Sequence, residues 1–210
     1  MTAVIDHLVY ACPELDAAVD ELAAATGVRA ENGGQHPGLG TSNALLSLGG
    51  RCYLELIAPD PGQPEPAGPR PWGLDHVRKP GLRAWAAAPD DLDAAVRSAR
   101  AAGHDPGDVV AGRRRTPDGR ELSWRMTQPP DTGDVAVAPF LIDWAGSPHP
   151  AVTAPAGLAL QRFVILTPDP GGLGGLLRAL GLDVPVEPAP APGLRAVLRV
   201  PGGGEVTLSS

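Results

Sequence analysis

Two side chains that can move protons or bind metals interrupt apolar, strand-like segments early in the chain. His7 lies within IDHLVYA, and Glu55 lies within YLELIA. A carboxylate buried among leucines is costly unless it is paired or bound to a metal. The alternative for Glu55 is that strand alternation turns it to solvent, and the alternative for His7 is a half-buried ring bonded to a neighbour. Both residues are candidates for a functional site.

A glycine-rich segment between these strands adds three more candidates. Residues 33–43 read GGQHPGLGTSN and contain His36, Thr41 and Asn43. We expect a loop there, because the segment is too rich in glycine for a helix or strand, and loops concentrate ligand-contacting residues. Its glycines permit close backbone approach, which would bring His36 toward the strand histidine and glutamate. The alternatives are an exposed His36 in a turn, and Thr41 and Asn43 that merely close the loop.

Two polar residues follow the apolar segment AVAPFLIDW at residues 136–144. Asp143 stands near its end, and His149 follows a few residues later. Both could complete a site at the end of a strand. Asp143 would equally suit a cap on the turn that follows.

An internal repeat indicates how these residues are positioned. LDAAV occurs at residues 15–19 and again at 92–96, and a fainter copy lies in LQRFVILTPDPGGLGGLL. Apolar residues at helical spacing predict outer helices near 14–26, 90–102 and 172–180. Period-two patterns and turn signals predict strands at 3–12, 44–48, 51–58, 82–88, 109–116, 120–127, 136–144, 158–167, 194–200 and 205–209. Each helix must cover one face of its own sheet, so the opposite face is free to line a cleft.

The segment at residues 59–80 is rich in proline. Proline removes amide donors and blocks both helices and central strands. We therefore expect an extended connector, without a regular helix of two or more turns.

Composition narrows the classes of function. The 17 basic and 24 acidic residues give a net charge of −7, which argues against nucleic-acid binding. The basic cluster at residues 113–115 precedes a Thr-Pro-Asp-Gly turn, so we expect a solvated hairpin. No apolar run approaches the ~18 residues of a membrane span, and the N-terminus lacks a basic signal-peptide region. With two cysteines outside any CxxC pattern, these features predict a soluble cytoplasmic protein with buried thiols.

Four motifs resemble those of a known family. They are DHLVY at residues 6–10, GG-x-HPG-x-GT-x-N at 33–43, YLEL at 53–56, and PFLIDW followed by HP at 139–144 and 149–150. Together with the repeat, they resemble the glyoxalase-like branch of the vicinal oxygen chelate superfamily. This superfamily includes glyoxalase I, extradiol dioxygenases, epimerases and bleomycin- or fosfomycin-resistance proteins. The resemblance covers nearly the whole chain and specifies a fold more than a reaction.

The resemblance implies an α+β fold of repeated βαβββ units, whose mixed, curved sheets form a cup with helices outside. Residues 1–150 would hold two paired units, at about 1–60 and 80–150. A shorter third β-α-β-β unit, residues 151–210, would pack on the same domain. The first and last strands of a unit would be neighbours, so His7 and Glu55 would face each other inside the cup.

The resemblance also implies a divalent metal site made by His7, Glu55 and His36. An imidazole–carboxylate set suits Zn, Fe, Mn, Co or Ni and leaves positions open for substrate. The family usually takes matching ligands from the second unit, and this chain departs there. Arg83 or Ala84 stands at the histidine position of the second unit, and Arg162 stands there in the third. Arginine cannot bind a metal but can hold an anionic group.

Two functions remain open from the sequence. The first is a metal-dependent lyase, isomerase or dioxygenase for a small oxygenated metabolite, in which Glu55 or His36 moves a proton. The second is a metal-free protein that binds a drug or metabolite in the same cup. The expected substrate contacts are Thr41, Asn43, Arg83, Asp143 and His149. The expected partner is a small molecule, without nucleic acid or membrane, and the resemblance allows a homodimer.

Overall fold

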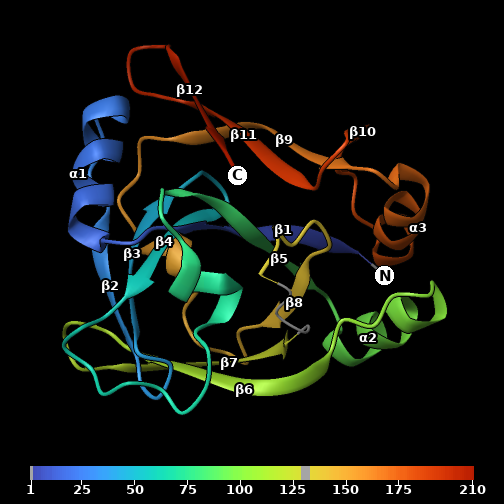
Figure 1. Ribbon diagram of the computed structural model, residues 1–210, viewed down its shortest axis with the longest axis horizontal. Helices are drawn as coiled ribbons and strands as arrows, with labels where there is room; N and C mark the ends of the chain where they lie inside the picture. The colour runs from blue at the N-terminus through green and yellow to red at the C-terminus, as the bar shows by residue number, and fades with distance from the viewer. Residues whose placement is uncertain (1, 129–132) are drawn as a thin grey trace.

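The computed structural model describes residues 2–128 and 133–210, which contain three successive repeats of strands around one helix (Figure 1). The first repeat comprises β1 (Ala3–Ala11), α1 (Leu15–Thr26), β2 (Glu31–His36), β3 (Thr41–Ser47) and β4 (Tyr53–Pro59). The second comprises β5 (Gly81–Pro89), α2 (Leu92–Ala101), β6 (Asp108–Arg115), β7 (Glu121–Gln128) and β8 (Phe140–Asp143). The third comprises β9 (Ala159–Thr167), α3 (Pro170–Leu180), β10 (Val186–Pro188), β11 (Gly193–Arg199) and β12 (Glu205–Ser209). The expected α+β fold of repeated units is confirmed.

The first two repeats form a closed barrel with the strand order β1-β4-β3-β2-β6-β7-β8-β5. In each repeat the last strand runs parallel to the first, β4 beside β1 and β8 beside β5. The repeats join through a long antiparallel pairing of β1 with β5. On the opposite side, the described strands β2 and β6 share a single residue pair, Gln35 with Arg115. The expected cup is therefore present, and its sheets curve far enough to close.

The three helices lie outside the strands, with α1 on one side and α2 and α3 on the other (Figure 1). Leu22 of α1, Val96 of α2 and Leu176 of α3 belong to one buried cluster with Leu54 and Leu56 of β4. Burial of apolar surface is the main favourable term in folding, at roughly 25 cal/mol per Å². The outer face of the barrel thus forms the larger of two hydrophobic clusters in the molecule.

Capping residues fix where the helices begin and end, so the expected bounds agree within about two residues. Asp91 accepts a hydrogen bond from the backbone N–H of Ala94 at 2.8 Å, and Asp169 accepts one from Gly172 at 2.9 Å. α1 ends at Gly27 with a φ of 74°, which a residue with a side chain rarely adopts. Within residues 2–128 and 133–210, no helix is long and apolar enough to cross a membrane.

The third repeat forms a separate sheet in the order β10-β9-β11-β12. Its first strand pairs with both β10 and β11, so the first and last strands are not neighbours as they are in the barrel. The short strand β10 was not expected from the sequence. The sheet packs against the barrel through Phe163, whose ring centroid is 5.3 Å from that of Trp85. The domain division at residue 150 stays a prediction.

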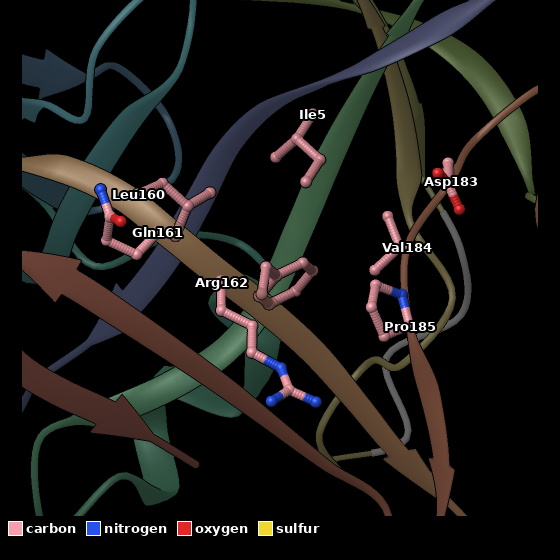
Figure 2. A pocket seen from close by; sticks show the side chains of 8 residues that line it. Ile5, Leu160, Gln161, Arg162, Asp183, Val184 and Pro185 are labelled. Carbon is pink, nitrogen blue, oxygen red and sulfur yellow. The ribbon is translucent and has the colours of Figure 1, made fainter.

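A pocket of about 270 Å³ lies between the barrel and this sheet. Figure 2 shows Ile5 of β1 on one side, and Leu160, Gln161 and Arg162 of β9 below it. Arg162 donates to Glu187 at 2.9 Å, so the guanidinium that aligns with His7 in the third repeat is used within its own sheet.

The connector between the first two repeats has no regular helix, as expected, but it does more than link them. It contains the 3₁₀ segment η1 (Pro71–His76), which Trp72 and Gly73 interrupt with φ values of 57° and 66°. Leu74 and Val77 are buried in the apolar cluster inside the barrel. The connector therefore helps to fill the barrel interior.

The expectation of a glycine-rich loop at residues 33–43 was wrong. This sequence forms the β2–β3 hairpin, and Gly33 and Gly34 of β2 allow close packing against β6. A Cβ atom on Gly33 would lie 2.2 Å from Nη1 of Arg114, and one on Gly34 would lie 1.9 Å from the carbonyl oxygen of Arg115. Glycine inside a strand often marks such an approach of another backbone or side chain.

The expected solvated hairpin at residues 113–115 is correct for its outer members and wrong for the middle one. The three arginines lie on β6, where successive side chains point to opposite faces. Arg113 and Arg115 are exposed, whereas Arg114 points into the barrel and is only 4% exposed. A buried guanidinium needs an acidic or polar partner.

Replacing Gly33 by Ala should lower the free energy of unfolding by about 1–3 kcal/mol, because the added methyl group overpacks the site of Arg114. Urea unfolding measures this loss. Gly68→Ala is the matched control, because a Cβ atom there meets nothing within 4 Å. Equal stability of the two variants would show that the close packing of β2 on β6 is not required.

Candidate functional site

Strand alternation explains why Glu55 faces the barrel interior. Leu54 and Leu56 on either side of it belong to the outer core, whereas Tyr53 and Ile57 belong to the inner apolar cluster. Glu55 shares the inner face with Tyr53 and Ile57 and is 6% exposed. The alternative of a solvent-facing Glu55 is therefore wrong.

A bulge in β1 gives the inner face a second carboxylate. The pairing of β1 with β5 shifts between Ile5 and His7, which leaves Asp6 as the extra residue. The ring of His7 stacks on Tyr53, with centroids 4.6 Å apart, and its Nδ1 lies 2.6 Å from Oδ1 of Asp6. Asp6 was not a candidate from the sequence. Its position beside a histidine in an apolar strand was the available signal.

Asp6 is held by three nitrogen atoms. Besides Nδ1 of His7, its Oδ2 lies 3.0 Å from Nε2 of His149 and 3.2 Å from Nε1 of Trp144. Burial raises the pKa of Asp6, but hydrogen bonds from His149 and His7 and their charges outweigh it, so the net pKa lies well below its ordinary value. Asp6 is thus an anion that orients two imidazole rings.

Glu55 lies at the centre of the polar side chains on the inner face. Its Oε1 accepts a hydrogen bond from Nδ2 of Asn43 at 2.5 Å. Its Oε2 is 3.6 Å from Nε2 of His7, and Oε1 is 3.8 Å from Nε2 of His36. Nη1 of Arg114 donates to Oδ1 of Asn43 at 3.1 Å, so Asn43 links the guanidinium to the carboxylate.

His36 is a neutral ring in this environment. Burial lowers its pKa, the carboxylate of Glu55 partly opposes this, and the charge of Arg114 reinforces it. Nδ1 of His36 lies 3.0 Å from Oγ1 of Thr41. The neutral ring carries one N–H and one lone pair, so it can donate to one partner and accept from another.

The structure brings together most of the expected residues. His7, His36, Thr41, Asn43 and Glu55 join one network, and the expected approach of His36 to Glu55 is confirmed. His149 joins it through Asp6. Their roles as catalytic, metal or substrate-binding residues stay predictions.

Two expected residues lie apart from this network. Oδ1 of Asp143 accepts from the backbone N–H of Ala145 at 2.9 Å, which is the turn cap left open as an alternative. Arg83 is the extra residue of a second bulge in the β1–β5 pairing. Its Nη2 donates to the carbonyl of Gly133, and its buried Nε has no partner among the described residues.

The donor chemistry of His7, His36 and Glu55 suits a divalent metal, but their arrangement is not a ready ligand set. In the part of the chain that is described, no group of three or more His, Cys, Asp or Glu side chains is placed to hold a metal ion. In addition, the amide of Asn43 occupies Oε1 of Glu55. These residues would therefore hold a metal only if Asn43 released Glu55.

Comparison with known proteins agrees with the geometry. A family model described as a glyoxalase-like domain matches residues 5–181. A hypothetical protein from Staphylococcus aureus has the same fold, with a TM-score of 0.61 and 15% identity over 99% of this chain and 85% of that chain. Methylmalonyl-CoA epimerase from Mycobacterium tuberculosis is 25% identical, with a TM-score of 0.41, over 66% of this chain and 84% of that chain. No curated protein matches the sequence.

Asp6→Asn should lower the free energy of unfolding by about 3 kcal/mol, because it leaves buried imidazoles without their anionic partner.

The wild type should also lose stability below about pH 4. Because the folded-state pKa of Asp6 is depressed, its contribution is present above the unfolded pKa and is lost as the pH falls through the folded value.

Urea unfolding from pH 7 to pH 2 measures both effects. The loss of stability at acidic pH should be smaller in Asp6→Asn than in the wild type. Asp16→Asn, at an exposed position of α1, is the control for removing one carboxylate. Parallel pH profiles for the wild type and Asp6→Asn would contradict an ionised Asp6.

Proposed function

Because this chain belongs to the glyoxalase-like domain family of the vicinal oxygen chelate superfamily, we propose that it is an enzyme of lyase or isomerase type that moves a proton on a small oxygenated molecule. One observation carries the proposal. His7 lies between two buried carboxylates, with Nδ1 2.6 Å from Asp6 and Nε2 3.6 Å from Glu55. An imidazole between two carboxylates is an arrangement suited to proton transfer.

Glu55 is the residue we assign as general base. Its carboxylate would take a proton from the substrate, and His7 would then share or return it. Asp6 acts as a positioning residue, because it fixes the Nδ1–H tautomer of His7 and leaves Nε2 toward Glu55. The amide of Asn43, whose oxygen accepts a hydrogen bond from Arg114, would stabilise negative charge that develops on a substrate oxygen.

A metal-dependent enzyme is the second candidate, and one observation favours it. Nε2 of His7 and Nε2 of His36 both face oxygens of one carboxylate at less than 4 Å. Asp6 and Thr41 hold the opposite nitrogen atoms of these rings, and metal-bound histidines usually have such a partner on the nitrogen that does not bind the metal. His7, His36 and Glu55 would hold such an ion once Asn43 releases Glu55, and the ion would supply Lewis acidity.

The homodimer and the cytoplasmic location stay predictions.

Glu55→Gln should reduce turnover by about 100-fold or more, because the amide cannot accept the proton. The assay incubates dicarbonyl, hydroxy-acid and catechol compounds with the protein in deuterated water and follows hydrogen exchange by NMR. Oxygen uptake on the same panel tests for a dioxygenase. Elemental analysis of the purified wild type and of His7→Asn tests for a metal that depends on His7.

Glu205→Gln, on the exposed surface of β12, is the matched control and should retain wild-type turnover. Turnover that survives Glu55→Gln unchanged would refute the assignment of the base. A wild type that binds a compound of the panel without ever converting it would instead support the metal-free binding protein.

A further inference from the structure

We infer that a second pocket, beside the β2–β6 junction, binds a small carboxylate through Arg114. The pocket has a volume of about 260 Å³ and lies next to the inner network. This inference rests on the proposed function, because it names carboxylates as the class of substrate for the proposed enzyme. The residues that line the pocket and carry the argument are Gly33, Leu45, Arg114, Leu122, Pro150 and Thr153.

Arg114 has more donors than its described partners use. A guanidinium carries five N–H donors. Among the described residues, its one hydrogen bond runs from Nη1 to Asn43. Because Arg114 is 96% buried (4% exposed) and lines the pocket, its remaining donors can be satisfied there. A planar carboxylate matches the paired N–H groups of a guanidinium.

The pocket combines this cation with apolar walls. Leu45, Leu122 and Pro150 form part of the lining, which suits the carbon skeleton of a small molecule. The other arginine of the lining, Arg120, is paired with Asp118 at 2.8 Å. Glu31 also lines the pocket and is exposed. Of the two arginines that line the pocket, Arg114 is thus the one that has no acidic hydrogen-bond partner among the described residues.

The packing of β2 on β6 lets the guanidinium reach Asn43. Gly33 leaves the space in which Nη1 of Arg114 approaches Asn43, since any side chain there would displace it. Asn43 in turn donates to Glu55. A carboxylate on Arg114 would therefore lie one amide side chain from the proposed base, as a recognition group should.

The test uses acetate, pyruvate and benzoate, with acetamide, pyruvamide and benzamide as their neutral counterparts, and follows binding by NMR titration of the full chain. At least one carboxylate should saturate the protein with an affinity about tenfold or more above that of its amide. Arg114→Lys keeps the charge but loses the planar pair of donors, and should weaken binding about tenfold.

A second pair of variants tests the pocket without touching the buried charges. Thr153→Trp should fill the pocket and abolish binding. Val152→Trp is the matched control, because Val152 is 75% exposed and does not line the pocket, and it should bind like the wild type. Amides that bind as tightly as carboxylates, inorganic phosphate that binds more tightly, or binding that survives Thr153→Trp would each overturn the inference.

The two proposals fail separately. If Glu55→Gln still binds the carboxylate while the wild type converts no compound, the binding site stands and the proposed reaction fails. If the wild type converts compounds and Thr153→Trp converts them equally well, the reaction stands and the binding site fails.

Discussion

Two carboxylates inside a closed barrel are the constraint on which the rest of the structure depends. Asp6 and Glu55 are buried among apolar residues, where an unpaired charge would be too costly to keep. Asp6 contacts its sequence neighbour His7, and it also binds Trp144 and His149 from a distant part of the chain. Glu55 draws in Asn43, and through it the guanidinium of Arg114. The inner network therefore ties the two repeats of the barrel together.

The positions of His7 and Glu55 in one candidate site could be predicted because their signal is local. His7 and Glu55 are polar residues inside apolar strands, and both repeats show the same order of elements. Asp6 was missed because its inward direction comes from a bulge, which depends on the pairing of β1 with β5 rather than on β1 alone. Asp143 points away from the barrel interior because its strand alternates regularly. Its neighbours Ile142 and Trp144 both face the interior, so Asp143 faces the other side.

Arg114 and the glycines of β2 show a second limit of the sequence. Glycine-rich sequence ordinarily indicates a loop, and three consecutive arginines ordinarily indicate a solvated surface. Here the glycine-rich strand and the buried arginine depend on each other. Gly33 has no side chain, and this leaves the space that the guanidinium of Arg114 occupies. Strand alternation alone already requires the middle arginine to face away from its neighbours. What could not be predicted was which face of β6 would be the interior.

The junction of β2 with β6 has consequences for how the barrel moves. A closed barrel normally removes sheet edges, and each strand is held by a ladder on both sides. Here one ladder is reduced to the pair of Gln35 with Arg115, whereas β1 and β5 are paired along most of their length. Among the described residues, this junction has the fewest paired residues of the barrel ladders, so we expect the interior to open there first. Amide exchange along β2 and β6 would then report how the barrel interior opens to solvent.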